Sequence, residues 1–98
     1  MGGGEHRLEF LGTALRSTMS GQGAATGYRF RVDGKQEVVV WVASLPVRYS
    51  REEVERAAEI LIRMRIEEGA DPGKMTELAL DGGAMAGVVR HPGWKGTN

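Results

Sequence analysis

Residues 38–43, Val-Val-Val-Trp-Val-Ala, decide how this fold is organised, because the stretch is apolar on two sides at once. Successive side chains of a β-strand point to opposite faces, so a strand with one exposed face alternates apolar and polar residues. This stretch does not alternate. As a strand it places three valines on one face and Val39, Trp41 and Ala43 on the other, and each face needs a cover.

The segment before this stretch predicts the other strand of a hairpin. Residues 28–32, Tyr-Arg-Phe-Arg-Val, alternate apolar and basic side chains, and Asp33-Gly34 is a dipeptide favoured in type I′ turns. A loop of two or four residues puts Trp41 with the aromatic residues of the first strand and leaves the arginines with the alternate valines. A loop of three residues exchanges the faces of the returning strand. We favour the first register, because it gathers the aromatic side chains in one core face.

One strong helix follows, predicted over residues 51–68. Ser50 and Glu53 have the spacing of a capping box, in which each side chain accepts from the other residue's backbone amide. Gly69 is a natural residue to end the helix, because glycine readily adopts the left-handed conformation there.

The apolar stripe of this helix is wider than contact with one sheet requires. At about 100° per residue its centre consists of small and branched residues, Val54, Ala57, Ala58 and Leu61. Ile60 lies at the edge of the stripe and Arg65 lies within it. We expect Arg65 to be paired, exposed at the helix end or held at a subunit contact, since an unpaired buried charge is costly.

The two ends of the chain complete the expected fold. Residues 8–15 predict a first strand, with residues 1–6 as a flexible N-terminus and residues 16–27 as a mobile loop rich in Gly and Ser. Residues 74–91 allow either a second hairpin or a short helix over 74–80 followed by a strand, and residues 95–98 form a tail. The prediction is one α+β domain, residues 1–98. A small antiparallel sheet of three to five strands packs against one main helix, in the order β-β-β-α-β with an optional last strand.

Composition restricts the classes of function. The 98 residues include 13 basic and 13 acidic side chains, so the net charge is zero, which disfavours strong nucleic-acid binding. The chain has no cysteine, which excludes disulfides, thiolate catalysis and cysteine-bound zinc. A chain of this length buries only about 65% of its unfolded surface, so oligomerisation would stabilise it. With no signal peptide and no apolar run of roughly 18–20 residues, we expect a cytoplasmic protein without a membrane segment.

No catalytic motif is evident in the sequence. Gly21, Gly23 and Gly27 lead into a strand rather than a helix, so a phosphate-binding loop is not expected. His6 and His91 are the only histidines, and neither lies in a pattern that brings carboxylates to it. We therefore expect no catalytic residues, no bound metal and no cofactor.

Three functions remain open, and the first is favoured. It is a self-associating protein-binding or regulatory module, most simply a homodimer, because interface cores are apolar and enriched in arginine. Its interface would use the valine face, the arginines beside it and the edge of the helix stripe: Val38, Val40, Val42, Arg29, Arg31, Ile60 and Arg65.

The other two functions need ligand contacts outside this face. One is a nucleic-acid-binding domain with an arginine-bearing strand face, and the other is a small-molecule pocket or enzyme formed at a subunit interface. Candidate contacts for either are the basic and aromatic residues that flank the helix and end the chain: Arg48, Tyr49, Arg90, His91 and Trp94.

Overall fold

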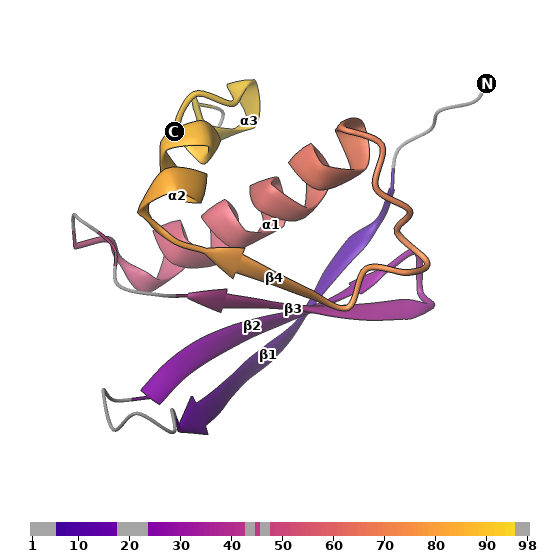
Figure 1. The fold of residues 1–98 in the computed structure, drawn as a ribbon, viewed down its shortest axis with the longest axis horizontal. Helices are drawn as coiled ribbons and strands as arrows, with labels where there is room; N and C mark the ends of the chain where they lie inside the picture. Colours follow the sequence, from indigo (N-terminus) through magenta and orange to yellow (C-terminus); the bar gives the residue numbers. More distant parts are fainter. Residues whose placement is uncertain (1–5, 18–23, 43–44, 46–47, 96–98) are drawn as a thin grey trace.

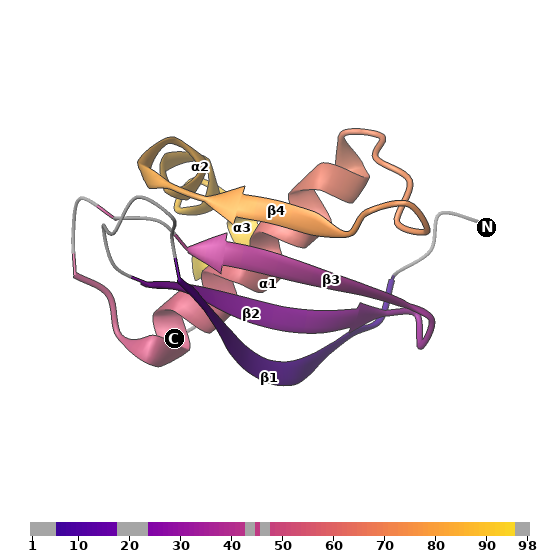
Figure 2. The same ribbon diagram turned by 60° about the horizontal axis from the view of Figure 1, so that its bottom comes forward.

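Four strands form one mixed sheet, and three helices lie on one side of it (Figures 1 and 2). The computed structural model describes residues 6–17, 24–42, 45 and 48–95. In chain order the elements are β1 (Leu8–Ser17), β2 (Ala24–Val32), β3 (Gln36–Val42), α1 (Arg51–Glu67), β4 (Glu77–Leu80), α2 (Gly82–Val88) and α3 (Pro92–Lys95). This confirms the predicted α+β class, the main helix and the order β-β-β-α-β.

The sheet has the order β1-β2-β3-β4. β1, β2 and β3 are antiparallel neighbours, as predicted, whereas β4 runs parallel to β3 at the sheet edge. The parallel pair arises because α1 carries the chain back along the sheet between the two strands, as a crossover helix does. The sheet is therefore mixed rather than wholly antiparallel.

The first hairpin is longer than the sequence indicated. β1 continues to Ser17 and β2 begins at Ala24, so the ends of the segment predicted as a loop over residues 16–27 are strand. A β-bulge between Phe10 and Gly12, where Gly12 has a φ of 130°, changes which side chains face the helices. Residues 18–23 of the predicted loop lie outside the described residues, as do residues 1–5, Ala43 and most of the predicted tail.

The favoured register of the second hairpin is wrong. Asp33 and Gly34 both have positive φ, as expected for the turn, and the amide of Lys35 donates to the carbonyl of Val32 at 3.0 Å. Lys35 nevertheless belongs to the loop, since Val32 pairs with Gln36. The loop therefore has three residues, and the faces of β3 are exchanged relative to our expectation.

The observed register gives the core its valines and excludes the tryptophan. Tyr28, paired with Val40, and Phe30, paired with Val38, form the helix-side face of the sheet, and Val38 and Val40 are fully buried. The small residues at the centre of α1 permit a close approach to the sheet. β-Branched valines fill such a space better than a tryptophan ring does, because protein cores are close-packed.

α1 begins and ends as predicted. Ser50 and Glu53 form both hydrogen bonds of the capping box, at 2.8 and 3.1 Å. At the other end the amide of Gly69 donates to the carbonyl of Ile66 and that of Ala70 to Arg65, the two hydrogen bonds of a Schellman motif. These local signals place the helix, and its apolar stripe is buried against the sheet, α2 and α3.

The last third of the chain differs from both sequence interpretations. Residues 77–80 form the parallel strand β4, and the following part of the segment, where both interpretations expected a strand, forms helix α2. Asp81, which could have started a turn, instead caps α2, because its side chain accepts from the amide of Ala84 at 2.8 Å. Of the helices in the described ranges, none is long and apolar enough to cross a membrane.

Candidate interaction surface

The face of the sheet turned away from α1 is the candidate site, and we call it the outer face. All three helices lie on the opposite side, so no described helix covers it (Figures 1 and 2). The strand registers assign to it, from β1 to β4, Glu9, Gly12, Ala14, Arg16, Ala25, Gly27, Arg29, Arg31, Glu37, Val39, Trp41, Glu77 and Ala79.

Trp41 is the largest apolar side chain on the outer face, and it lies across the neighbouring strand. Its six-membered ring lies across Gly27 on β2, where an added Cβ would come within 2.9 Å of Cζ3. The guanidinium carbon of Arg16, on β1, lies 4.1 Å from the centre of the indole ring, in cation–π geometry. Gly27 therefore provides the space that lets Trp41 lie over the neighbouring strand and reach Arg16.

The indole N–H of Trp41 has no hydrogen-bond acceptor among the described residues, and the Nε1 atom is buried. Val39, two residues earlier on the same face, remains only partly buried. These two side chains form the apolar centre of the outer face. In the registers Ala79 lies next to Trp41 on β4, and Ala14 lies beyond Gly27 on β1.

Two ion pairs lie on the side of this apolar centre that is nearer the β2–β3 turn. Nε of Arg29 donates to the Glu37 carboxylate at 2.8 Å, and Arg31 lies 4.0 Å from Glu9. The bond to Arg29 lowers the pKa of Glu37, and the same bond raises the pKa of Arg29. With Arg16 and Glu77, the face carries three arginines and three glutamates, so its formal charge is zero.

The structure places the predicted interface residues on both sides of the sheet. Arg29 and Arg31 lie on the outer face, whereas Val38 and Val40 lie in the core and Val42 packs against it. Ile60 and Arg65 lie on α1, on the other side of the sheet. Surface valines were expected here because the register was off by one residue.

The helix residues do not reach the outer face. Ile60 is 4% exposed and lies beneath α3, close to Gly93, so the wide apolar stripe of α1 is explained by the later helices rather than by a subunit contact. Arg65 lies in the last turn of α1, where its guanidinium pairs with Glu68 at 3.0 Å. It is paired at the helix end, which was one of the three expected arrangements.

Of the five residues predicted as ligand contacts, the fold brings two aromatic side chains together. Tyr49 and Trp94 meet edge to face with their ring centres 6.3 Å apart. His91 instead contacts Glu67 near the end of α1, at 3.3 Å, and Arg48 and Arg90 are exposed. These contacts hold the end of the chain against α1 and the segment before it.

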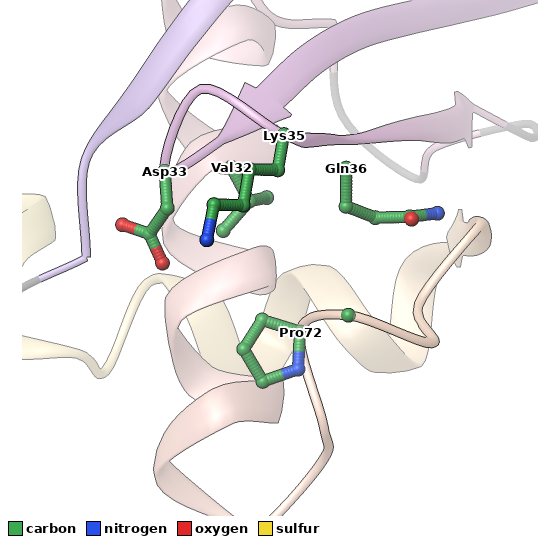
Figure 3. Close-up of a pocket in the computed structure, with 6 residues that line it drawn as sticks. Val32, Asp33, Lys35, Gln36 and Pro72 are labelled. Carbon is green, nitrogen blue, oxygen red and sulfur yellow. The ribbon is translucent and has the colours of Figure 1, made fainter.

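One shallow hollow lies between the β2–β3 turn and the loop after α1. Figure 3 shows Asp33, Lys35 and Gln36 on one side of it and Pro72 on the other. Its volume is about 140 Å³, below the roughly 300–1,000 Å³ of typical ligand pockets. Asp33 is already bonded to the His6 ring at 2.8 Å and to the amide of Arg7, and both bonds lower its pKa. Those bonds join the N-terminal segment to the turn.

Neither metal chemistry nor similarity to known proteins assigns a function. Across the part of the chain that the structure describes, no three His, Asp or Glu side chains come together in a way that could hold a metal ion. Comparison with protein-family models gave no match, and comparisons with curated proteins and with solved structures found no similar chain. The outer face is therefore the feature of the molecule from which a function can be inferred.

Proposed function

We propose that this chain is a non-enzymatic binding module that self-associates through its outer face. The observation that carries the proposal is the position of Val39 and Trp41, which form an apolar centre on a sheet face that no described helix covers. Apolar side chains on both faces of a strand require two covers, and the helices of the described residues cover one face only. We also propose a cytoplasmic location, because a chain without cysteine is compatible with a reducing compartment.

The charges of the outer face favour a protein partner over a nucleic acid. Phosphate recognition relies on arginines and lysines that are not already neutralised. Here Arg29 and Arg31 each face a glutamate of the same sheet face, and the formal charge of the face is zero. A neutral face with an apolar centre and ion pairs beside it has the composition of a protein interface.

Nucleic-acid binding is the second candidate function, and the observed pairing of β2 with β3 is the observation that favours it. Trp41 shares a face with Arg29 and Arg31, so an aromatic ring and arginines occur together, contrary to the register that we favoured from the sequence. Such a combination could stack a base and contact its phosphates. Against this, the ring already has Arg16 stacked on it, and it is the only aromatic residue among the outer-face positions.

Backbone NMR titrations of the full chain test both candidates together. Dilution from millimolar to low micromolar concentration should shift the amide signals of Val39, Trp41 and Gly27 and leave those of α1 unchanged. Addition of a single-stranded oligonucleotide at low salt should leave all of them unchanged. Signals that are constant on dilution would contradict self-association, and outer-face shifts with the oligonucleotide would favour the second candidate.

A further inference from the structure

We infer that the partner on the outer face is a second copy of this chain, packed face to face with its strands antiparallel to those of the first. This inference rests on the proposed function and adds the orientation of the two copies. Three features of the molecule support it: the rows of side chains across the sheet, the charges at the two ends of the outer face and the form of the sheet edges.

The registers order the outer face into four rows that run across the strands. The first row contains Glu9, Arg31 and Glu37, and the last described row contains Arg16 and Ala25. The first row therefore has a formal charge of −1 and the last a formal charge of +1. Between them lie a row with Val39 at its centre and a row with Trp41 at its centre.

Consider a twofold axis that lies between the two sheets and runs perpendicular to the strands, midway between the Val39 row and the Trp41 row. It places the Val39 row opposite the partner's Trp41 row, and the first row opposite the partner's last row. Each strand then lies over its own copy in the opposite direction, and Trp41 packs on the partner's Val39. The large indole meets the smaller valine, and the reverse contact occurs on the other side of the axis. This isologous arrangement uses each contact twice, as twofold interfaces do.

The same axis pairs the charged ends. Arg16 of one copy faces the partner's Glu9, and no described residue of the face is placed opposite a residue of like charge. Among the described residues Arg16 has no acidic partner within its own chain, and Glu9 is held only by the 4.0 Å contact with Arg31. A twofold axis parallel to the strands, between β2 and β3, would instead set Arg31 opposite the partner's Glu37, although each already has a partner in its own chain, and would separate Arg16 from the partner's Glu9. Complementary charges across an interface select orientation in this way.

The edges of the sheet are poor alternatives for self-association. β1 is interrupted by the bulge at Gly12, and β4 has only four residues. Bulges and short edge strands are the features by which natural sheets avoid pairing at their edges. The face is therefore the better surface for a second copy.

The size of the face predicts a weak dimer. Four strands span about 19 Å, and the seven residues of β3 span about 23 Å. Two copies would then bury roughly 900 Å², which is below the roughly 1,200 Å² of stable specific interfaces and in the range of weak, transient ones. We expect a dissociation constant in the micromolar range.

Charge reversal measured by sedimentation equilibrium tests the orientation. Glu9→Arg and Arg16→Glu should each weaken the dimer by about five- to thirty-fold, because each places like charges opposite each other. The double variant, with both substitutions in one chain, should recover the wild-type affinity. Glu59→Arg and Arg63→Glu, which reverse an ion pair on α1, are the matched controls and should leave the affinity unchanged.

Crosslinking provides a second measurement. Because the chain has no cysteine, Ala14→Cys introduces one thiol per chain. A short bismaleimide should join two Ala14→Cys chains, since β1 lies over β1 of the partner in the proposed arrangement. Crosslinks that form only between Ala14→Cys and Ala79→Cys chains would show the other axis and overturn the inference.

The outcomes separate the two proposals. A wild-type chain that stays monomeric at millimolar concentration overturns both. A dimer whose affinity is unaffected by the single charge reversals, or whose affinity is not recovered in the double variant, overturns only the antiparallel orientation. Far-UV circular dichroism of each variant confirms that the fold is retained.

Discussion

Gly27→Ala should destabilise the chain, although alanine is usually better than glycine in a strand. The substitution adds a Cβ that would lie 2.7 Å from Cγ1 of Val39 and 2.9 Å from Cζ3 of Trp41. Real Cβ atoms essentially never approach heavy atoms so closely, and neither neighbour is the end of a flexible chain. Trp41 must therefore move off β2 or the strands must separate.

The magnitude follows from two opposing contributions to the free energy of unfolding. Overpacking typically costs about 1–3 kcal/mol. Replacing glycine by alanine in a strand recovers roughly 0.5–1 kcal/mol of backbone entropy. We expect a net loss of about 1–2 kcal/mol.

Urea unfolding followed by far-UV circular dichroism measures this loss, at a concentration where the monomer dominates. The matched control is Gly87→Ala in α2, where the new Cβ would lie 3.3 Å from Cε of Met64, the end of a flexible side chain. Because a helix favours alanine by up to about 1 kcal/mol, this control should be neutral or stabilising.

A double-mutant cycle assigns the loss to Trp41. In a Trp41→Ala background the penalty of Gly27→Ala should fall by at least about 0.5 kcal/mol, because one of the two obstructing side chains is gone. A Gly27→Ala variant as stable as the wild type would refute the packing of Trp41 over β2. So would a penalty that is unchanged in the Trp41→Ala background.

Three further predictions test other parts of the structure. Trp41→Phe should change the free energy of unfolding by less than about 1 kcal/mol, since it removes a buried donor that has no acceptor among the described residues, and a loss above 2 kcal/mol would contradict this. Ser50→Ala should cost about 1 kcal/mol by thermal unfolding, because the capping box is lost, whereas Arg51→Ala should not. The stability difference between wild type and Glu37→Gln should be fully present above pH 4.5. It should disappear as the pH falls through the lowered pKa of Glu37, and a difference independent of pH would contradict the bond to Arg29.

The main helix could be predicted from the sequence because its determinants are local. The capping box at Ser50, the apolar stripe and the glycine at position 69 all lie within α1 or next to it, and the structure confirms each of them. The same holds for the first strand and for the turn at Asp33-Gly34. Signals of this kind depend on a few neighbouring residues, so a single sequence is enough to detect them.

The assignment of the β3 side chains to the two faces of the sheet was wrong because of a single residue. Lys35 can belong either to the turn or to β3, and this choice exchanges every side chain of the returning strand between the two faces. What decides it is tertiary: the fit of Val38 and Val40 beneath α1 and the pairing of β3 with β4. The glycine at position 12 did carry a readable signal, because a glycine inside a strand often marks a bulge.

The C-terminal third could not be predicted for a similar reason. Asp81-Gly82-Gly83 is compatible with a hairpin turn and with a capped helix start, and the sequence does not separate the two. Met85 and Val88 decide in favour of a helix, because α2 buries both of them in the core. That burial also covers the edge of the α1 stripe, which sequence reasoning assigned to a subunit contact.

Sedimentation equilibrium of three chains can show whether the outer face is the surface of self-association. The wild type should show a monomer–dimer equilibrium in the micromolar range, and Val39→Lys, at the apolar centre of the outer face, should be a monomer. Leu15→Lys, which changes the most exposed large apolar residue and lies on the opposite side of the sheet, should dimerise like the wild type. A wild-type monomer at every concentration, or a dimer abolished by Leu15→Lys and retained in Val39→Lys, would show that the chain does not self-associate through the outer face.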